Sequence, residues 1–272
     1  VLANMVLDAD NLKTSNGEIY LAVDNLALKP WQSFFSGPRF SASDGKGNLK
    51  LWMGLKSGQI QTAQSKLNFN QLTMHDRSIN QTLYFDQFKA NTAWHTIKNG
   101  WELTADQINI EFEKKLWPEN KVVVRYQKDT NTFYVYVQHM LIEPLMSMTA
   151  GQIPSLSSVA SRLPHGYLTD MQFQLTNNTL SYLLTRFTQL GWKTQSSTPG
   201  VDNLSGVLNW QPSEGHLAID SNNTTIQLPT KKPIVLKGLN AAFEWKELSH
   251  GLRVSMDHLV VNHPDLLISA TG

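Results

Sequence analysis

The chain has 272 residues, with 23 Lys and Arg against 22 Asp and Glu, and 41% of its residues are hydrophobic. This hydrophobic content is that of a folded protein, whereas a formal net charge of +1 provides no basic field, so we expect no nucleic-acid partner. Cysteine is absent, which excludes disulfides and thiolate metal sites and is in keeping with a bacterial periplasm.

The first predicted strand contains a change of phase at Asp24. Apolar residues alternate before it and resume one position out of step after it: Ile19, Leu21 and Val23, then Leu26 and Leu28. Alternation with a period of two predicts a strand with one buried face. The change of phase would turn the second half of the strand to the opposite face unless a β-bulge absorbs one residue. We therefore predict a long, bulged and curved strand, with Asp24 as its bulge marker.

Further copies of this pattern follow along the chain, and the clear ones are marked by Asp106 and Asp257. Their apolar positions are Trp101, Leu103, Ala105, Ile108 and Ile110 in the first, and Leu252, Val254, Met256, Leu259 and Val261 in the second. Looser copies begin at Ile60 and Phe133, and the first three copies start at positions 19, 60 and 101. Because the Asp recurs at the same place, it indicates a repeated structural task, such as binding the backbone N–H groups of a bulge, rather than an active site.

Helices are expected at a few places between the strands. Apolar stretches follow Pro30 and Pro144, where proline suits the first turn of a helix. The residues Leu180–Leu190 place their apolar side chains on one helical stripe. Three Trp residues, Trp94, Trp210 and Trp245, each stand seven positions before the next strand pattern, which predicts antiparallel hairpins.

Together these elements predict a mainly β fold. We expect an elongated, curved antiparallel sheet, shaped as a gutter or taco-like groove, of long bulged strands with a few short helices. Two imperfect units are expected, residues 1–132 and 133–272, each a strand, a helical cap and a meander. Without a Gly-, Ser- or Pro-rich linker between them, we expect one continuous elongated domain, cut from a larger protein.

The sequence lacks the motifs of known catalytic chemistry. It has no G-x-S-x-G, Walker, H-E-x-x-H or G-x-G-x-x-G motif, so we expect no enzyme activity and no cofactor. His258 and His263 stand near Asp257 without metal-ligand spacing, so we expect no metal site. A carboxylate pair for glycoside hydrolysis has no fixed spacing, and no residue of the chain points to one. The eight Trp leave a carbohydrate-binding or adhesive extracytoplasmic domain as the alternative function.

Four apolar-patterned stretches carry a resemblance. They are Leu12…Trp31, LPHGYL at 163–168, PGVDNLSGVL at 199–208, and Leu236–Trp245 with GLRV at 251–254 and NHPDL at 262–266. With these stretches the chain resembles the AsmA-like envelope proteins, and most closely the central region of the YhdP family. The resemblance implies a periplasmic segment of a protein anchored in the inner membrane of a Gram-negative bacterium, with the anchor outside this sequence. It also implies an apolar groove that carries phospholipid acyl chains between the inner and outer membranes.

A sheet with one strongly apolar face must cover that face, close on itself or fill the face with a ligand. The chain offers few helical stretches as a cover, so we expect an open groove; a closed core is the alternative. The residues expected to line the groove are Trp101, Leu103, Ile108, Ile110, Leu252, Val254, Met256, Leu259 and Val261.

Overall fold

The computed structural model describes residues 2–6, 16–33, 36–37, 40–77, 80–112, 114–143, 146, 161–195, 198–229 and 232–272. These residues form long antiparallel strands with very little helix, and the chain divides into two compact units, Val1–Phe133 and Tyr134–Gly272. The expected fold class, a mainly β fold built as an open, curved antiparallel sheet, is confirmed. That the two units are parts of one continuous domain stays a prediction.

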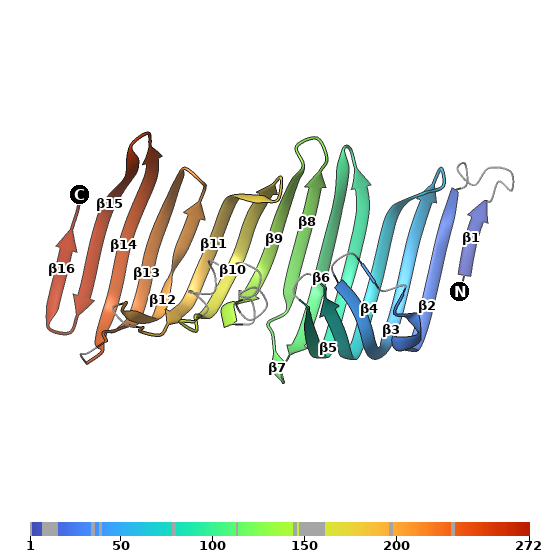
Figure 1. Ribbon diagram of the computed structural model, residues 1–272, viewed down its shortest axis with the longest axis horizontal. Coiled ribbons are helices and arrows are strands. Elements are labelled where there is room, and N and C mark those ends of the chain that lie inside the picture. Colours follow the sequence, from blue (N-terminus) through green and yellow to red (C-terminus); the bar gives the residue numbers. More distant parts are fainter. Residues whose placement is uncertain are drawn as a thin grey trace. The chain divides into compact units, whose positions relative to one another are not determined.

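The first unit is a meander in which successive strands pair (Figure 1). Its order is β1-β2-β3-β4-β5-β6-β8, and the two-residue β7 pairs with β6. The strands are β1 (Leu2–Val6), β2 (Asn16–Ala27), β3 (Phe40–Lys56), β4 (Gln59–Asp76), β5 (Gln81–Ile97), β6 (Gly100–Phe112), β7 (Lys115–Leu116) and β8 (Asn120–Gln127).

The second unit continues as another meander, and its first strand, β9, begins two residues before the boundary. Its order is β9-β10-β11-β12-β13-β14-β15-β16. The strands are β9 (Thr132–Leu141), β10 (His165–Thr176), β11 (Thr179–Trp192), β12 (Gly200–Trp210), β13 (Glu214–Gln227), β14 (Ile234–Leu248), β15 (Gly251–His263) and β16 (Leu266–Ala270).

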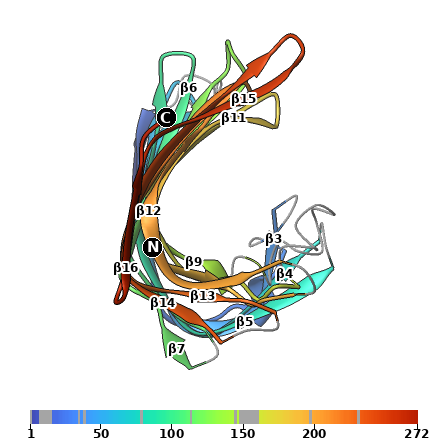
Figure 2. The same ribbon diagram turned by 90° about the vertical axis from the view of Figure 1, so that its left-hand side faces the viewer.

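The strands of each unit bend strongly along their own length (Figure 2). Single residues in the left-handed region interrupt them, and most have the amide or short polar side chains that tolerate this conformation. They include Asn25, Gln71 and Gln107 in the first unit, and Asp170, Gln189, Asn203 and Asn223 in the second. Such interruptions increase the local twist and bend the strand.

The phase change in β2 coincides with one of these bends. Val23 pairs with Leu49 of β3 and Leu26 pairs with Gly47, so Asp24 and Asn25 stand opposite the single residue Asn48 and β2 has one extra residue. Positions 49 and 47 of β3 are two apart, so they point to the same face of the sheet. Val23 and Leu26 therefore share that face although they are three residues apart in sequence.

The buried core of the first unit lies on this face. It consists of Leu26, Leu28, Leu49, Phe69, Leu72 and Phe85. A single 3₁₀ turn, η2 (Lys29–Trp31), follows β2, and Leu28, which is 2% exposed, donates its N–H to Gly45 O at 2.9 Å. Gly45 has φ 143° and a Cβ there would contact Leu28 and Leu72, so glycine is required where the two strands and η2 meet.

The helix expected over Leu180–Leu190 is wrong, because these residues belong to strand β11. Gln189 has φ 52° and the pairing with β12 shifts beside it. Thr185 and Phe187 are buried on one side of the strand, and Leu190 follows the bend. The alternation with a period of two is interrupted there, so the apolar spacing resembles that of a helix.

Helical residues are few in the described ranges. The turn after Leu28 is the short helix expected at Pro30, and Ile142 and Glu143 are helical before Pro144. The helical cap expected beyond Pro144 lies mostly at residues 147–160, outside the described residues. Within those ranges, no helix has the length and hydropathy needed to cross a membrane.

Replacing Asn25 with Val tests the bend in β2. A β-branched residue is disfavoured at φ 56°, and we expect Asn25→Val to lower the free energy of urea unfolding by about 1–2 kcal/mol. Asn25→Gly keeps the backbone N–H that binds Asn48 Oδ1 at 2.9 Å, and should change stability by less than about 0.5 kcal/mol. Equal losses in both variants would contradict the left-handed bend.

Candidate functional site

One face of the second unit keeps its apolar side chains together across the bend in β15. The facing of β15 side chains can be compared with that of β14, because the pairing of β14 with β13 has no register shift. The β15 residues Val254, Met256, Leu259 and Val261 pair with Trp245, Phe243, Ala241 and Leu239. All four β14 partners have odd numbers and therefore point to one face. The shift that allows this lies between Met256 and His258, so Asp257 is the extra residue.

Strand β6 of the first unit repeats the arrangement. Leu103, Ala105 and Ile110 pair with Trp94, Thr92 and Phe88 of β5, which again share one face. Asp106 pairs with Asn91 and the next pair is Asn109 with Lys89, so Gln107 and Ile108 stand opposite the single residue Ala90, and Gln107 has φ 48°.

The expected groove-lining residues meet different surroundings in the two strands. In β6, Ile108 is buried, and Trp101 packs against Tyr126 and Phe133 with ring centroids 6.0 and 6.2 Å apart. In β15, Leu252 and Val254 are 63% and 60% exposed. Their lining of a groove stays a prediction.

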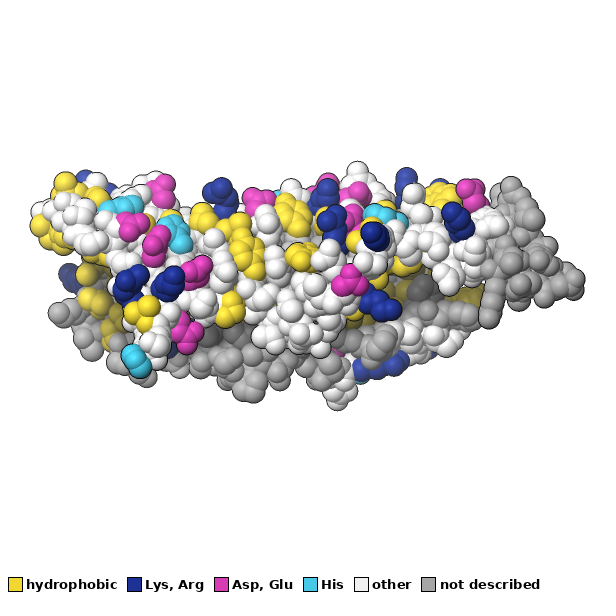
Figure 3. Space-filling model, turned by 90° about the horizontal axis from the view of Figure 1, so that it is seen from above, with side chains coloured by type: hydrophobic (Ala, Val, Ile, Leu, Met, Phe, Trp, Pro, Cys, Tyr) yellow, Lys and Arg dark blue, Asp and Glu magenta, His cyan; other side chains and the backbone are white. Residues whose placement is uncertain are grey.

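Exposed apolar side chains continue into the next strand, because Leu266, Leu267 and Ile268 of β16 are also exposed. Figure 3 shows hydrophobic side chains lying between charged ones on the surface it views. The described residues provide no second layer of strands or helices over the apolar face of either unit.

The opposite face of β12–β15 is polar. Asn209, His216, Glu244 and Ser255 form one cross-strand row, through the pairs Asn209 with His216, His216 with Glu244, and Glu244 with Ser255. In the next row, Lys246 lies 3.9 Å from Glu214. The sheet of the second unit thus separates an apolar from a polar surface.

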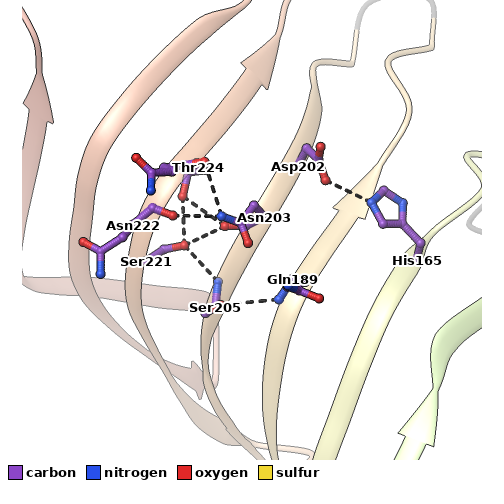
Figure 4. A network of polar contacts seen from close by, with 9 residues as sticks. His165, Gln189, Asp202, Asn203, Ser205, Ser221, Asn222 and Thr224 are labelled. Carbon is purple, nitrogen blue, oxygen red and sulfur yellow. Dashed lines mark hydrogen bonds and ion pairs between the residues drawn. The ribbon is translucent and has the colours of Figure 1, made fainter. Parts of the chain in front are cut away.

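The bend across β11–β13 is held by hydrogen bonds from small polar side chains (Figure 4). Ser221 Oγ accepts the N–H of Ser205 at 3.1 Å and donates to Asn203 O at 2.8 Å. Thr224, which is fully buried, donates to Ser221 Oγ at 2.8 Å. Asn203 Nδ2 donates to Asn222 O at 2.9 Å. Backbone groups that the bulge removes from the regular ladder therefore find partners, which they need when buried.

The three Asp bulge markers stand at positions where the pairing shifts, Asp24 in β2, Asp106 in β6 and Asp257 in β15. The task expected for them is done at the first bulge by another residue, because the N–H of Asn25 is bound by Asn48 Oδ1. In the part of the chain described, these three Asp side chains therefore stand at the bends but do not bind the backbone N–H groups of the bulges.

One perturbed ionisable group lies at the β10 bend. Burial raises the pKa of Tyr136, and Asp170 adds to this because the Tyr136 hydroxyl donates to its Oδ1 at 3.1 Å. The neutral phenol is therefore favoured in the fold, where it ties β9 to the left-handed Asp170.

His258 and His263, which stand near Asp257 in the sequence, contact other residues. His258 Nε2 contacts Asn240 Oδ1, and His263 Nδ1 accepts the N–H of Asp265 at 3.2 Å. The fold instead brings His216, Glu244 and Asp257 together, with their ligand atoms within 4.8 Å of one another. The sequence did not reveal this group, because it comes from three strands and depends on their register.

Comparisons with known proteins place the chain in a family. The family described as YhdP protein matches residues 2–272. The chain belongs to the YhdP family. It is 21% identical over 271 residues to the intermembrane phospholipid transporter YhdP of Escherichia coli (strain K12), an alignment that covers 92% of this chain and 21% of that relative. The chain thus spans about a fifth of the length of this relative. No solved structure matches the chain.

Deleting Gln107 tests whether the extra residue in β6 keeps the apolar face together. Without it, either Ile108 and Ile110 turn to the polar face or β6 slips against β5. We expect the deletion to lower the free energy of unfolding by roughly 2–4 kcal/mol, measured by urea titration of tryptophan fluorescence.

Gln107→Gly is the matched control, because it removes the same side chain but keeps the residue count and permits φ 48°. It should cost much less than the deletion. If the deletion is no more destabilising than the glycine variant, the bulge does not hold the register.

Proposed function

We propose that this chain is a periplasmic segment of an inner-membrane-anchored protein of a Gram-negative bacterium. Its apolar face carries phospholipid acyl chains between the inner and outer membranes, and the anchor lies outside these residues. No catalytic step is assigned to it.

The observation that carries the proposal is the continuous apolar face of β14 and β15. Trp245, Phe243 and Ala241 share this face with Val254 and Met256. An acyl chain has no hydrogen-bonding groups, so it needs a surface that offers none, and each methylene removed from water contributes about 0.8 kcal/mol. The exposed Leu252 and Val254 would gain this contribution on contact with an acyl chain.

The separation of faces supports a carrier rather than a membrane-inserted element. The polar row of Asn209, His216 and Glu244 lies on the opposite side of the same strands. Water on that side and acyl chains on the other let lipid move along the sheet while the protein stays in an aqueous compartment. The name of the relative from Escherichia coli, intermembrane phospholipid transporter, points the same way.

The carbohydrate-binding alternative calls for a row of exposed aromatic rings. Trp94, Trp210 and Trp245 are each half-buried. Trp210 and Trp245 both pair with Gly215, which puts these two tryptophans on the apolar face. The exposed tryptophans of the described residues are Trp31 and Trp52, and they belong to different elements, η2 and β3.

A pair of substitutions on β15 tests the proposal. Val254 and Ser255 are neighbours on opposite faces, and both are exposed. We expect Val254→Arg to reduce phospholipid retained by the purified chain, measured by native mass spectrometry, about tenfold, because a charge would lie against the acyl chain.

Ser255→Arg is the control, since it adds the same charge to the same strand on the polar face. It should retain lipid as the unmodified chain does. Equal retention by both variants, or absence of phospholipid from the unmodified chain after exposure to phospholipid vesicles, would contradict the proposal.

A further inference from the structure

We propose that His216, Glu244 and Asp257 form a binding site for a divalent cation of the Zn²⁺ class on the polar face of the second unit. This inference does not depend on lipid carriage, because the three side chains lie on the face opposite to the apolar one.

The register of three strands builds the site. His216 of β13 pairs directly with Glu244 of β14, and Glu244 pairs with Ser255 of β15. Side chains of directly opposed residues stand about 4.5–5.5 Å apart at Cβ. Asp257 lies two residues beyond Ser255, on the same side of β15, at the extra residue of the bulge. The result is one imidazole and two carboxylates with ligand atoms within 4.8 Å of one another.

This set matches the ligands that Zn²⁺ takes in proteins with three protein donors and one open position. Bonds of about 2.0–2.1 Å in a tetrahedron place neighbouring ligand atoms about 3.3 Å apart. The present separations are all within 4.8 Å, and small side-chain rotations can bring them to this distance, because Glu244 and Asp257 are exposed and form no ion pair within the described residues. Two adjacent carboxylates also repel each other, and a cation between them relieves this repulsion.

A second observation points to a ligand at the same place. Asn209, which pairs with His216, has its Oδ1 atom buried and without a hydrogen-bond partner. A buried polar atom without a partner costs free energy, about 1–3 kcal/mol. Asn209, His216, Glu244 and Ser255 all line one pocket of about 410 Å³.

The cations around the pocket leave the site accessible to a metal. Lys246 and Arg253 line the same pocket, but Lys246 lies 3.9 Å from Glu214 Oε2. Arg253 belongs to the row of Lys246, one row away from Glu244 and Ser255. A bound cation would join β13, β14 and β15 at the Asp257 bulge and so hold the bend that keeps Met256 and Leu259 on one face.

Isothermal titration calorimetry of the metal-free 272-residue chain with ZnCl₂ tests the site. We expect one Zn²⁺ per chain, binding more tightly than Mg²⁺ or Ca²⁺, which prefer all-oxygen ligand sets. His216→Gln, Glu244→Gln and Asp257→Asn should each weaken Zn²⁺ binding about tenfold or more. Co²⁺ added in place of Zn²⁺ should give visible absorption bands that these variants lose.

The matched controls are His250→Gln and Glu247→Gln, exposed residues of the same hairpin. They should bind Zn²⁺ as the unmodified chain does, and circular dichroism should show that all variants are folded. Absence of Zn²⁺ binding, or binding that survives substitution of any of the three proposed ligands as well as it survives the controls, would overturn the site.

Discussion

The need to keep one apolar face on a strand that bends governs this structure. A strand alternates its side chains between two faces, so any residue added to accommodate a bend reverses every side chain beyond it. The chain resolves this by changing the phase of its apolar pattern at the place where the extra residue lies. In β2 the pairing steps from Val23 to Leu26, and in β15 from Met256 to His258, while the apolar residues on both sides keep their facing.

Bending has a second cost, because a bulge takes backbone groups out of the ladder. Asn, Ser and Thr side chains replace the missing partners: Asn48 at Asn25, and Ser221 and Thr224 around Asn203. Only 17% of residues are charged, and mean hydropathy is −0.29. The polarity resides in short side chains that bond locally. The two units use the apolar face differently: the first buries Leu26, Leu28 and their neighbours, whereas β15 and β16 expose theirs.

Much of the fold was predictable from the sequence, because alternation and its phase changes are local signals. The strand patterns around Asp24, Asp106 and Asp257 needed no knowledge of the partner strands. At Leu180–Leu190 the same change of phase gives a strand the period of a helix, because the strand bends at Gln189. The group of His216, Glu244 and Asp257 was not predictable, because the first two are 28 positions apart in the sequence and only the β13–β14 register makes them neighbours. The partner of the Asn25 N–H was likewise hidden, since Asn48 belongs to the next strand.

Single cysteines placed along β15 test most directly whether the apolar face is kept across the bend, and the chain has no cysteine of its own. Each cysteine at positions 252–261 would carry a fluorophore, with quenching by a phospholipid that bears a nitroxide on its acyl chain. We expect strong quenching at 252, 254 and 256, then at 259 and 261, with weak quenching between them. Quenching that continues at even positions beyond Asp257, or that is equal at every position, would contradict it.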